Sequence, residues 1–283
     1  MDETRRSGAP AAAAPSARIN RVYDQFMYDD LFRAYWGHSD FVNFGYWAPG
    51  TRDQQEACEN LMEKLLAFLP ERTGTILDAA CGKGATTRHL LKYYAPEAVT
   101  GINISEKQLQ TCAANAPGCR FLLMNAADLK FEDGTFDNIL CVEAAFHFDT
   151  RERFLREACR VLKPGGRLLL SDSLFTRWWE RIKPPGRMLN YVEDAAAYRE
   201  LCQSAGFGEA ESVAQLRPLP AGPLPRRGDR SGRPREDERQ NVALRPQHPP
   251  LSAGGGAQAG RPGPRRHGIR YQTFTLSQRA IGR

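Results

Sequence analysis

The segment that decides the fold reads Thr75-Ile76-Leu77-Asp78-Ala79-Ala80-Cys81-Gly82-Lys83-Gly84, and residues 85–91 continue it. Its short apolar run predicts a buried parallel strand, which a glycine turn and a helix then follow. This order of elements presents backbone N–H groups to a ligand at the carboxyl edge of a doubly wound sheet. Asp78 stands at the end of the strand, where a carboxylate can accept hydrogen bonds or face a cation.

The glycine turn alone does not identify the ligand. A nicotinamide-binding turn has a third glycine, and Thr87 occupies that position here. With Asp78 upstream, the stretch resembles the first motif of class I S-adenosylmethionine-dependent methyltransferases, D-x-G-x-G-x-G, in which Ala80 replaces the first glycine. An ordinary strand-to-helix turn is the alternative interpretation.

Composition limits the classes of protein that this chain can belong to. Its 283 residues allow one large or two small domains, and no apolar run approaches the ~20 residues of a membrane span. Residues 1–17 lack the apolar centre of a secretory signal, so we expect a disordered arm. The seven cysteines are odd in number and form no Cys-x-x-Cys pair, which favours reduced thiols in a cytoplasmic protein without a metal site.

The net charge of the chain is unevenly distributed. The whole chain carries +6, but residues 217–283 contain 14 Arg, no Lys and 4 acidic residues, a balance of +10. The remainder therefore carries −4. A mildly acidic globular part gives no reason to expect binding to nucleic acid.

Residues 18–50 are rich in aromatic side chains, with ten between Tyr23 and Trp47. Helical spacing from residue 19 to 36 predicts one helix or two short ones. These aromatics either cover the sheet edge or form a lid, and aromatic faces stabilise a sulfonium cation. The pattern of Tyr23, Asp24, Tyr28 and Gly45-Tyr46-Trp47 resembles the N-terminal lid of antibiotic-tailoring methyltransferases, which implies lid or substrate contacts for Tyr28, Tyr46 and Trp47.

Residues 51–216 carry the alternating pattern of an α/β core. Further strands are expected at 98–105, 119–124, 137–142, 167–171 and 209–216, and further helices at 51–69, 106–115, 150–162 and 195–205. The segment Val161-Leu-Lys-Pro-Gly-Gly166 is expected to form a tight turn before an apolar strand, and it resembles the same family. The resemblance implies a doubly wound, Rossmann-like seven-stranded sheet, mostly parallel with an antiparallel last strand, with helices on both faces.

The cofactor site follows from the ends of the expected strands. Asn103 stands where such sheets usually carry an acid that binds ribose hydroxyls, so a weaker contact is expected there. The resemblance to the family implies that Asn125 and Ala126 meet the adenine, although a helix-capping loop would explain them too. The resemblance implies these cofactor-binding residues: Asp78, Ala80, Gly82, Gly84, Asn103, Gln108, Asn125, Ala126 and Val142.

Three residues are candidates for catalysis. His147 follows the fourth core strand, and imidazole can take a proton near pH 7. Glu143 is a comparable candidate for the catalytic role given to His147. Tyr23 could orient the substrate, as could Tyr46. A structural or cofactor-facing role for His147 is the alternative.

Residues 217–267 form a low-complexity segment of Arg, Pro and Gly that cannot bury enough apolar surface to fold. We consider two origins, out-of-frame translation of GC-rich DNA and a genuine basic linker. Residues 268–283 would then contain the last strand and the C-terminus.

The sequence thus predicts a cytoplasmic S-adenosylmethionine-dependent methyltransferase that acts on the O, N or C atom of a small secondary metabolite. One alternative is C-methylation of a prenyl double bond in a terpenoid-indole alkaloid, with cyclisation driven by the carbocation. Others are a nucleic-acid methyltransferase, which the motifs do not favour, and a non-enzymatic cofactor-binding protein. We expect no nucleic-acid or membrane partner, and the sequence leaves open the acceptor and the formation of a homo-oligomer.

Overall fold

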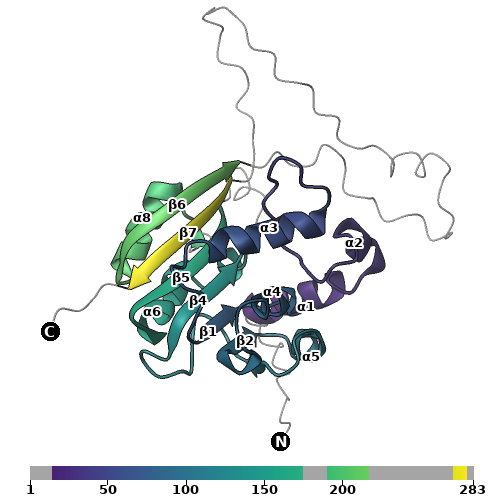
Figure 1. Cartoon of the computed structure of the whole chain (residues 1–283), viewed down its shortest axis with the longest axis horizontal. Helices are drawn as coiled ribbons and strands as arrows, with labels where there is room; N and C mark the ends of the chain where they lie inside the picture. The colour runs from purple at the N-terminus through teal and green to yellow at the C-terminus, as the bar shows by residue number, and fades with distance from the viewer. Residues whose placement is uncertain (1–14, 175–189, 217–269, 279–283) are drawn as a thin grey trace, which may run out of the picture. The chain divides into compact units, whose positions relative to one another are not determined.

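The computed structural model describes residues 15–174, 190–216 and 270–278, and its centre is one β-sheet (Figure 1). Within these residues the sheet has seven strands in the order β3-β2-β1-β4-β5-β7-β6. The strands are β1 (Ile76–Ala79), β2 (Val99–Asn103), β3 (Arg120–Leu123), β4 (Phe136–Val142), β5 (Leu162–Leu174), β6 (Phe207–Leu216) and β7 (Arg270–Gln278). The α-helices are α1 (Pro15–Phe26), α2 (Asp30–Tyr35), α3 (Gln54–Leu66), α4 (Ala85–Leu90), α5 (Glu106–Asn115), α6 (Arg151–Val161) and α8 (Ala195–Ser204).

The strand order reverses next to β1. From β1 the chain builds outward through β2 and β3, and it then returns to add β4 and β5 on the other side. These five strands pair in parallel, whereas β7 runs antiparallel to both β5 and β6. The expected Rossmann-like, mostly parallel sheet is confirmed. Ligands bind such sheets at the carboxyl edge where the order reverses, which here is the edge beside β1 and β4.

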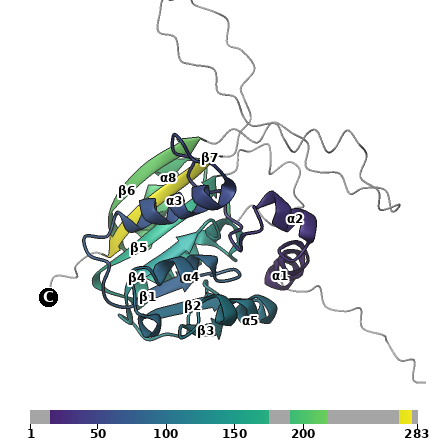
Figure 2. The same cartoon turned by 45° about the vertical axis from the view of Figure 1, so that its right-hand side comes forward.

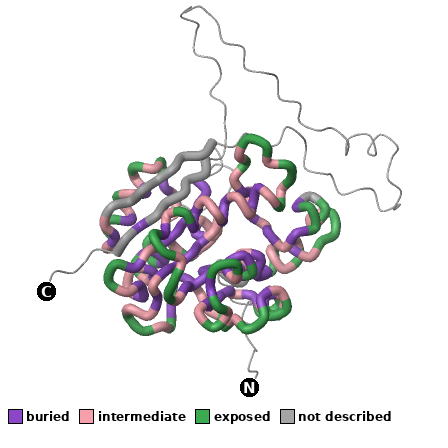
Figure 3. Tube along the Cα trace, viewed as in Figure 1, coloured by how far each residue is buried: buried purple, intermediate pink, exposed green. Residues whose placement is uncertain are grey.

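Alternate residues of a strand point to opposite faces of the sheet. Apolar side chains on both faces pack against helices, so both faces are covered. Leu77 and Ile139 belong to one buried apolar cluster together with residues of α6 and α8. Ile76 and Leu140, their neighbours in sequence, belong to a second cluster with residues of α3 and α4. Figures 1 and 2 show α3 and α4 in front of the strands, and Figure 3 shows the buried positions concentrated along the inner strands.

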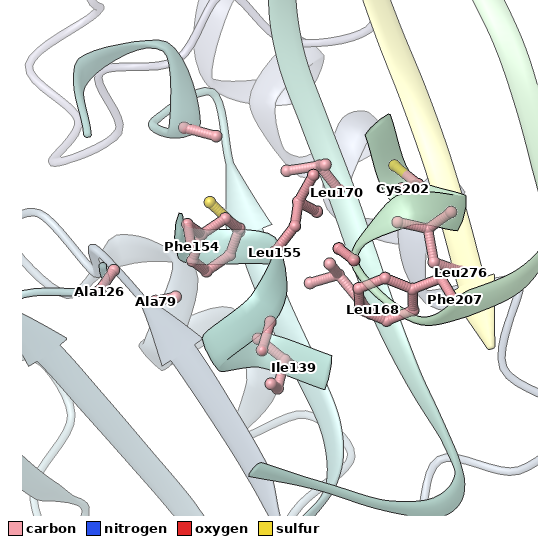
Figure 4. Packing of buried hydrophobic residues seen from close by; sticks show 14 of the residues in the cluster. Ala79, Ala126, Ile139, Phe154, Leu155, Leu168, Leu170, Cys202, Phe207 and Leu276 are labelled. Carbon is pink, nitrogen blue, oxygen red and sulfur yellow. The ribbon is translucent and has the colours of Figure 1, made fainter. Parts of the chain in front are cut away.

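The larger cluster joins α6 and α8 to the sheet (Figure 4). Phe154 and Leu155 of α6 belong to this cluster together with Leu168 and Leu170 of β5, and all four side chains are fully buried. Burying one such side chain contributes about 1.5–3 kcal/mol, so this layer holds α6 firmly against the sheet.

Helix starts follow the expected capping chemistry. Ser105 accepts the backbone N–H of Gln108 at the start of α5, and Thr150 accepts that of Arg153 at the start of α6. A side-chain oxygen at this position satisfies one of the four amides that a helix start leaves unpaired. The helix predicted at residues 106–115 therefore begins directly after Ser105.

Three details differ from or refine the sequence predictions. Residues 19–36 form two helices, because Asp29 adopts an extended conformation and caps α2. The turn predicted at residues 163–166 lies inside β5 instead, where the pairing with β4 jumps from Phe136↔Leu162 to Asn138↔Arg167. Helix α1 begins at Pro15, within the predicted arm. Residues 1–14 and 217–269 lie outside the described residues, and so do the two hypotheses on the Arg/Pro/Gly segment.

No helix in the described residues is long and apolar enough to cross a bilayer.

A buried ion pair ties α6 to β5 and α8. Arg151 donates its Nε–H to Asp172 Oδ2 at 2.6 Å, and the two side chains are only 4% and 0% exposed. The same guanidinium donates to the carbonyls of Ser173 and Asn190, while Tyr198 Oη donates to Asp172 at 2.9 Å. Removing one partner of a pair this deeply buried leaves the other charge without compensation.

We expect Arg151→Met to lower the free energy of unfolding by about 3–5 kcal/mol, measured by urea denaturation, because Asp172 would remain buried without its cation. The matched control is Arg156→Met on the same helix, whose exposed pair with Glu152 should change stability by less than about 1 kcal/mol. Equal effects of the two substitutions would contradict the role given to the buried pair.

Candidate functional site

A cavity of about 1070 Å³, including the space at its open mouth, lies at the carboxyl ends of the parallel strands. Its lining comes from α1, residues 40–43, the turn after β1, and the ends of β2 and β4 together with Met124–Ala126 after β3. Segments far apart in the chain therefore meet at the edge where the strand order reverses. This is the edge that the sequence predicted as the functional site.

The turn after β1 needs three residues in the left-handed region, with φ of +66° at Ala80, +55° at Gly82 and +85° at Gly84. A Cβ on Gly84 would lie 2.9 Å from Cα of Cys112, so α5 packs too closely for any side chain there. A Cβ on Gly82 would meet only Met27 Cε, at 3.9 Å. Gly84 thus serves packing, whereas Gly82 leaves open the cavity wall that a ligand can approach.

Asp78 stabilises the glycine turn through hydrogen bonds with the first turn of α4. Its Oδ2 accepts hydrogen bonds from the hydroxyls of Thr86 and Thr87, each at 2.7 Å, and its residue surface is 1% exposed. It is not among the residues that line the cavity. Burial raises the pKa of Asp78 to about 6, against the opposing effect of the two hydroxyl hydrogen bonds. The structure therefore places Asp78 as a support for the start of α4.

Asn103 lines the cavity at the end of β2, as the sequence predicted, and its side chain belongs to a hydrogen-bonded network. Its Nδ2 donates to the Gly82 carbonyl and to Gln108 Oε1, both at 2.9 Å. Its Oδ1 accepts the Ser105 N–H at 3.1 Å. Gln108 also lines the cavity and donates its Nε2–H to Asp24 of α1 at 2.8 Å. The carboxylate of Asp24 on α1 is thus connected, through Gln108, to the amide of Asn103 at the end of β2.

Asn125 and Ala126 line the cavity at the end of β3. Asn125 Oδ1 accepts the Ala127 N–H at 2.9 Å, and its Nδ2 donates to Asp149 Oδ2 at 3.2 Å. Asn125 therefore orders the loop that holds Ala126. Asp149, which also lines the cavity, was missed by the sequence reasoning, although its place just after the β4 edge was a usable signal.

The three catalytic candidates line the cavity together. Tyr23 Oη and His147 Nε2 lie 2.5 Å apart, and their rings meet edge to face. This contact joins α1 to the short 3₁₀ helix that follows β4. Glu143 adopts a left-handed conformation, with φ of +49°, and its Oε2 accepts the N–H of Phe44 at 2.8 Å. Its carboxylate thus holds the segment that precedes α3.

Among the other predicted residues, Ala80, Gly82 and Val142 line the cavity, whereas Tyr28, Tyr46 and Trp47 do not. Tyr28 bonds to Thr111 Oγ1 at 2.7 Å on α5, and Trp47 donates its indole N–H to the Phe44 carbonyl at 3.1 Å. The structure thus gives these two side chains packing and hydrogen-bonding contacts outside the cavity lining.

Lys83, inside the glycine turn, was missed by the sequence reasoning. Its side chain is 3% exposed, and its Nζ lies 2.7 Å from Asp40 Oδ1 and 3.2 Å from the Met27 carbonyl. Lys83 and Asp40 both line the cavity. From the sequence alone, a lysine in a glycine turn would be interpreted as a ligand contact or as an exposed charge. The structure shows that Lys83 pairs with Asp40, which lies in a distant part of the chain.

Two buried polar atoms of cavity-lining residues have no hydrogen-bond partner within the described residues. They are Oδ1 of Asn20 and Nδ2 of Asn43. An unsatisfied buried acceptor or donor costs about 1–3 kcal/mol, so a polar ligand that reaches these atoms would recover that free energy.

The raised pKa of Asp78 predicts a pH-dependent stability. Since the folded protein holds this proton up to about pH 6 and the unfolded chain releases it near pH 4, unfolding becomes easier as pH rises across that window. Asp78→Asn removes the titration. We expect the stability of the wild type, measured against this variant by urea denaturation, to fall by about 3 kcal/mol between pH 4 and pH 7.

Asp30→Asn, whose side chain is 97% exposed, is the control for the loss of a carboxylate. A difference between wild type and Asp78→Asn that stays constant with pH would show that Asp78 is ionised in the folded protein throughout.

Comparisons with known proteins show the family of this chain. A family model described as "Methyltransferase domain" matches residues 77–170, from β1 to β5. The chain is 32% identical over 219 residues to the 27-O-demethylrifamycin SV methyltransferase of Amycolatopsis mediterranei, covering 70% of this chain and 76% of that protein. It is 34% identical over 167 residues to the 2-methyl-6-phytyl-1,4-hydroquinone methyltransferase of Synechocystis, covering 56% of this chain and 51% of that protein.

Solved structures show the same fold. A geranyl diphosphate methyltransferase, solved with its substrate and sinefungin, aligns with a TM-score of 0.66 at 14% identity and covers 93% of this chain and 99% of that one. At this identity the likeness concerns the fold alone, and it does not favour prenyl C-methylation here. The rifamycin relative, matched over three quarters of its length, decides the family. This chain is an enzyme of the S-adenosylmethionine-dependent methyltransferases.

Proposed function

We propose that this methyltransferase transfers the methyl group of S-adenosylmethionine to an oxygen or nitrogen atom of a small secondary metabolite. The observation that supports this most is that the glycine turn and the Tyr23–His147 pair line the same cavity. A cofactor at the turn and an acceptor at the pair would share one enclosed space, which is the arrangement a direct transfer requires.

The residues of the cavity suit the cofactor. The open wall over Gly82 leaves room for it, and the polar residues Asn20 and Asn43 line the same cavity. Glu143 and Asp149 supply carboxylates around a cation, and Tyr23 supplies an aromatic ring. We assign the ribose to Asn103 and Gln108, and the adenine to the Asn125–Ala126 loop, with Ala80 and Val142 completing the wall.

The bound cofactor supplies a methyl group already activated by its sulfonium, so the protein has to align the acceptor and manage one proton. His147 Nε2 accepts that proton, directly or through the Tyr23 hydroxyl, which lies 2.5 Å away. Tyr23 also holds the imidazole in orientation. We give Glu143 a positioning role, because its Oε2 is engaged by the Phe44 N–H.

Residues 18–50 act as a lid in this proposal. Tyr23, Met27 and Phe41 contribute to the cavity wall, and Lys83 holds both Asp40 and the Met27 carbonyl at the glycine turn. Excluding water strengthens the remaining polar contacts and protects the transfer. Residues 51–216 with 268–283 would form the catalytic core, and the aromatic side chains of the cavity favour an apolar acceptor with one ionisable O–H or N–H. Free small molecules rather than nucleic acid are the proposed substrates.

The test is transfer of radiolabelled methyl groups from S-adenosylmethionine into separate panels of phenols, sugar hydroxyls, secondary amines and prenylated indoles, with transfer RNA and duplex DNA alongside. We expect label in phenols, hydroxyls or amines. Label confined to nucleic acid or to prenyl carbon would overturn the proposed acceptor class, and tight cofactor binding with no label in any panel would overturn methyl transfer as the function.

With an acceptor in hand, we expect His147→Gln to lower kcat by about 10²–10⁴-fold, the usual contribution of a general base, with the affinity for S-adenosylhomocysteine changed less than threefold. Tyr23→Phe should lower kcat by about tenfold, since it removes the hydroxyl and keeps the ring. Tyr93→Phe, an exposed tyrosine bonded to Glu63, is the matched control. Full activity of His147→Gln would remove His147 from the mechanism.

A further inference from the structure

Helix α1 and the residues just after it direct a row of three polar side chains toward α5 and the residues that precede it. Asn20 and Asp24 are four residues apart on the same side of α1, and Tyr28 follows two residues after the end of the helix. Asn20 Nδ2 donates to the Ile104 carbonyl at 2.9 Å, and Tyr28 Oη donates to the Lys107 carbonyl at 3.1 Å. Figures 1 and 2 show α1 beside α5. The first and last members of this row thus anchor the helix.

The middle member, Asp24, makes a different kind of contact. Its Oδ1 accepts the Ser105 hydroxyl at 2.6 Å and the Gln108 Nε2–H at 2.8 Å. Gln108 in turn accepts the Asn103 Nδ2–H with its Oε1 at 2.9 Å. A carboxylate is therefore connected through one amide to a second amide at the end of β2. Gln108 and Asn103 are buried, and both line the cavity.

The direction of these hydrogen bonds matters. Both N–H bonds of Asn103 are used, one toward Gln108 and one toward the Gly82 carbonyl, so its Oδ1 is the atom left to meet a ligand. That oxygen accepts the Ser105 N–H and retains one lone pair. A negative charge at the far end of a chain of amides polarises each of them, which makes the last oxygen a stronger acceptor.

We propose that Asp24 is the positioning residue of ribose recognition, and that it gives the Asn103 Oδ1, through Gln108, the acceptor strength that a carboxylate on β2 would otherwise provide. This inference rests on the proposed position of the ribose at Asn103. It also makes the placement of α1 and the recognition of the ribose parts of one network, because the carboxylate comes from the lid.

The same geometry explains why residue 103 is an amide in this chain. A carboxylate at position 103 could not donate to the Gly82 carbonyl or to Gln108 Oε1, and both acceptors would lose their partner. It would also bring a second negative charge into a network that already holds Asp24.

The test uses calorimetry with two probes, S-adenosylhomocysteine and its 2′-deoxyribose analogue, on the full chain. The wild type should bind S-adenosylhomocysteine at least tenfold more tightly than the analogue. Asp24→Asn should weaken S-adenosylhomocysteine about tenfold and bring the ratio of the two affinities below about three.

Two further variants complete the design. Gln108→Leu breaks the connection and leaves the Ser105–Asp24 contact, so it should also lose the discrimination between the probes. Asp30→Asn removes an exposed carboxylate from α2, next in the chain, and should leave both affinities within twofold. Circular dichroism of each variant confirms that it is folded.

The outcomes distinguish a failure of the proposed Asp24–Gln108–Asn103 network from a failure of the proposed cofactor site. Equal weakening of both probes by Asp24→Asn would show that Asp24 only fixes α1, and would overturn the inference, as would unchanged affinities. If the folded wild type binds neither probe, the proposed cofactor site itself fails.

Discussion

The structure depends on a backbone turn that a chain of L-amino acids rarely adopts. Three residues between β1 and α4 take left-handed conformations, and the strain at Ala80 alone costs of order 1 kcal/mol. Asp78 offsets this cost, since its buried carboxyl group holds the hydroxyls of Thr86 and Thr87 and so fixes the first turn of α4. The backbone at Gly82 is therefore not covered by other side chains, and it forms part of the cavity wall.

Segments on both sides of the cavity are attached to this turn. Asn103 holds the Gly82 carbonyl from β2, and Lys83 reaches Asp40 and Met27 in the N-terminal segment. The position of the N-terminal segment is thus set by the same few residues that shape the proposed cofactor site. The Tyr23–His147 contact adds a link to the far wall, beyond β4. In our account, cofactor binding and enclosure of the acceptor are therefore physically coupled.

Much of the fold could be predicted because its signals are local. The alternating apolar residues and the glycine turn each constrain a few neighbouring residues, and parallel strand ends must meet at one edge. The turn expected at residues 163–166 lies inside β5 because pairing with β4 extends to Leu162, and a long-range pairing of this kind leaves no local mark.

The candidate site was predicted less completely, for a related reason. Strand-end residues such as Asn103, Asn125 and His147 do line the cavity, as their positions indicated. The contacts of Asp24 with Gln108 and of Lys83 with Asp40 join residues 43 or more positions apart, and a single sequence does not show which charges will meet. For Asp78, the motif suggested a ligand contact, whereas burial and two threonine hydroxyls give it a supporting role.

The most direct test of this account is calorimetric titration of the folded protein with S-adenosylhomocysteine, comparing wild type, Gly82→Val and Gly165→Val. Both glycines have positive φ and leave room for a Cβ, so the two substitutions carry similar backbone strain, but only Gly82 lines the cavity. We predict binding to wild type and Gly165→Val within threefold of each other, and a loss of at least about thirtyfold for Gly82→Val. Absence of heat with the wild type, or equal affinity of all three proteins, would contradict the placement of the cofactor at this turn.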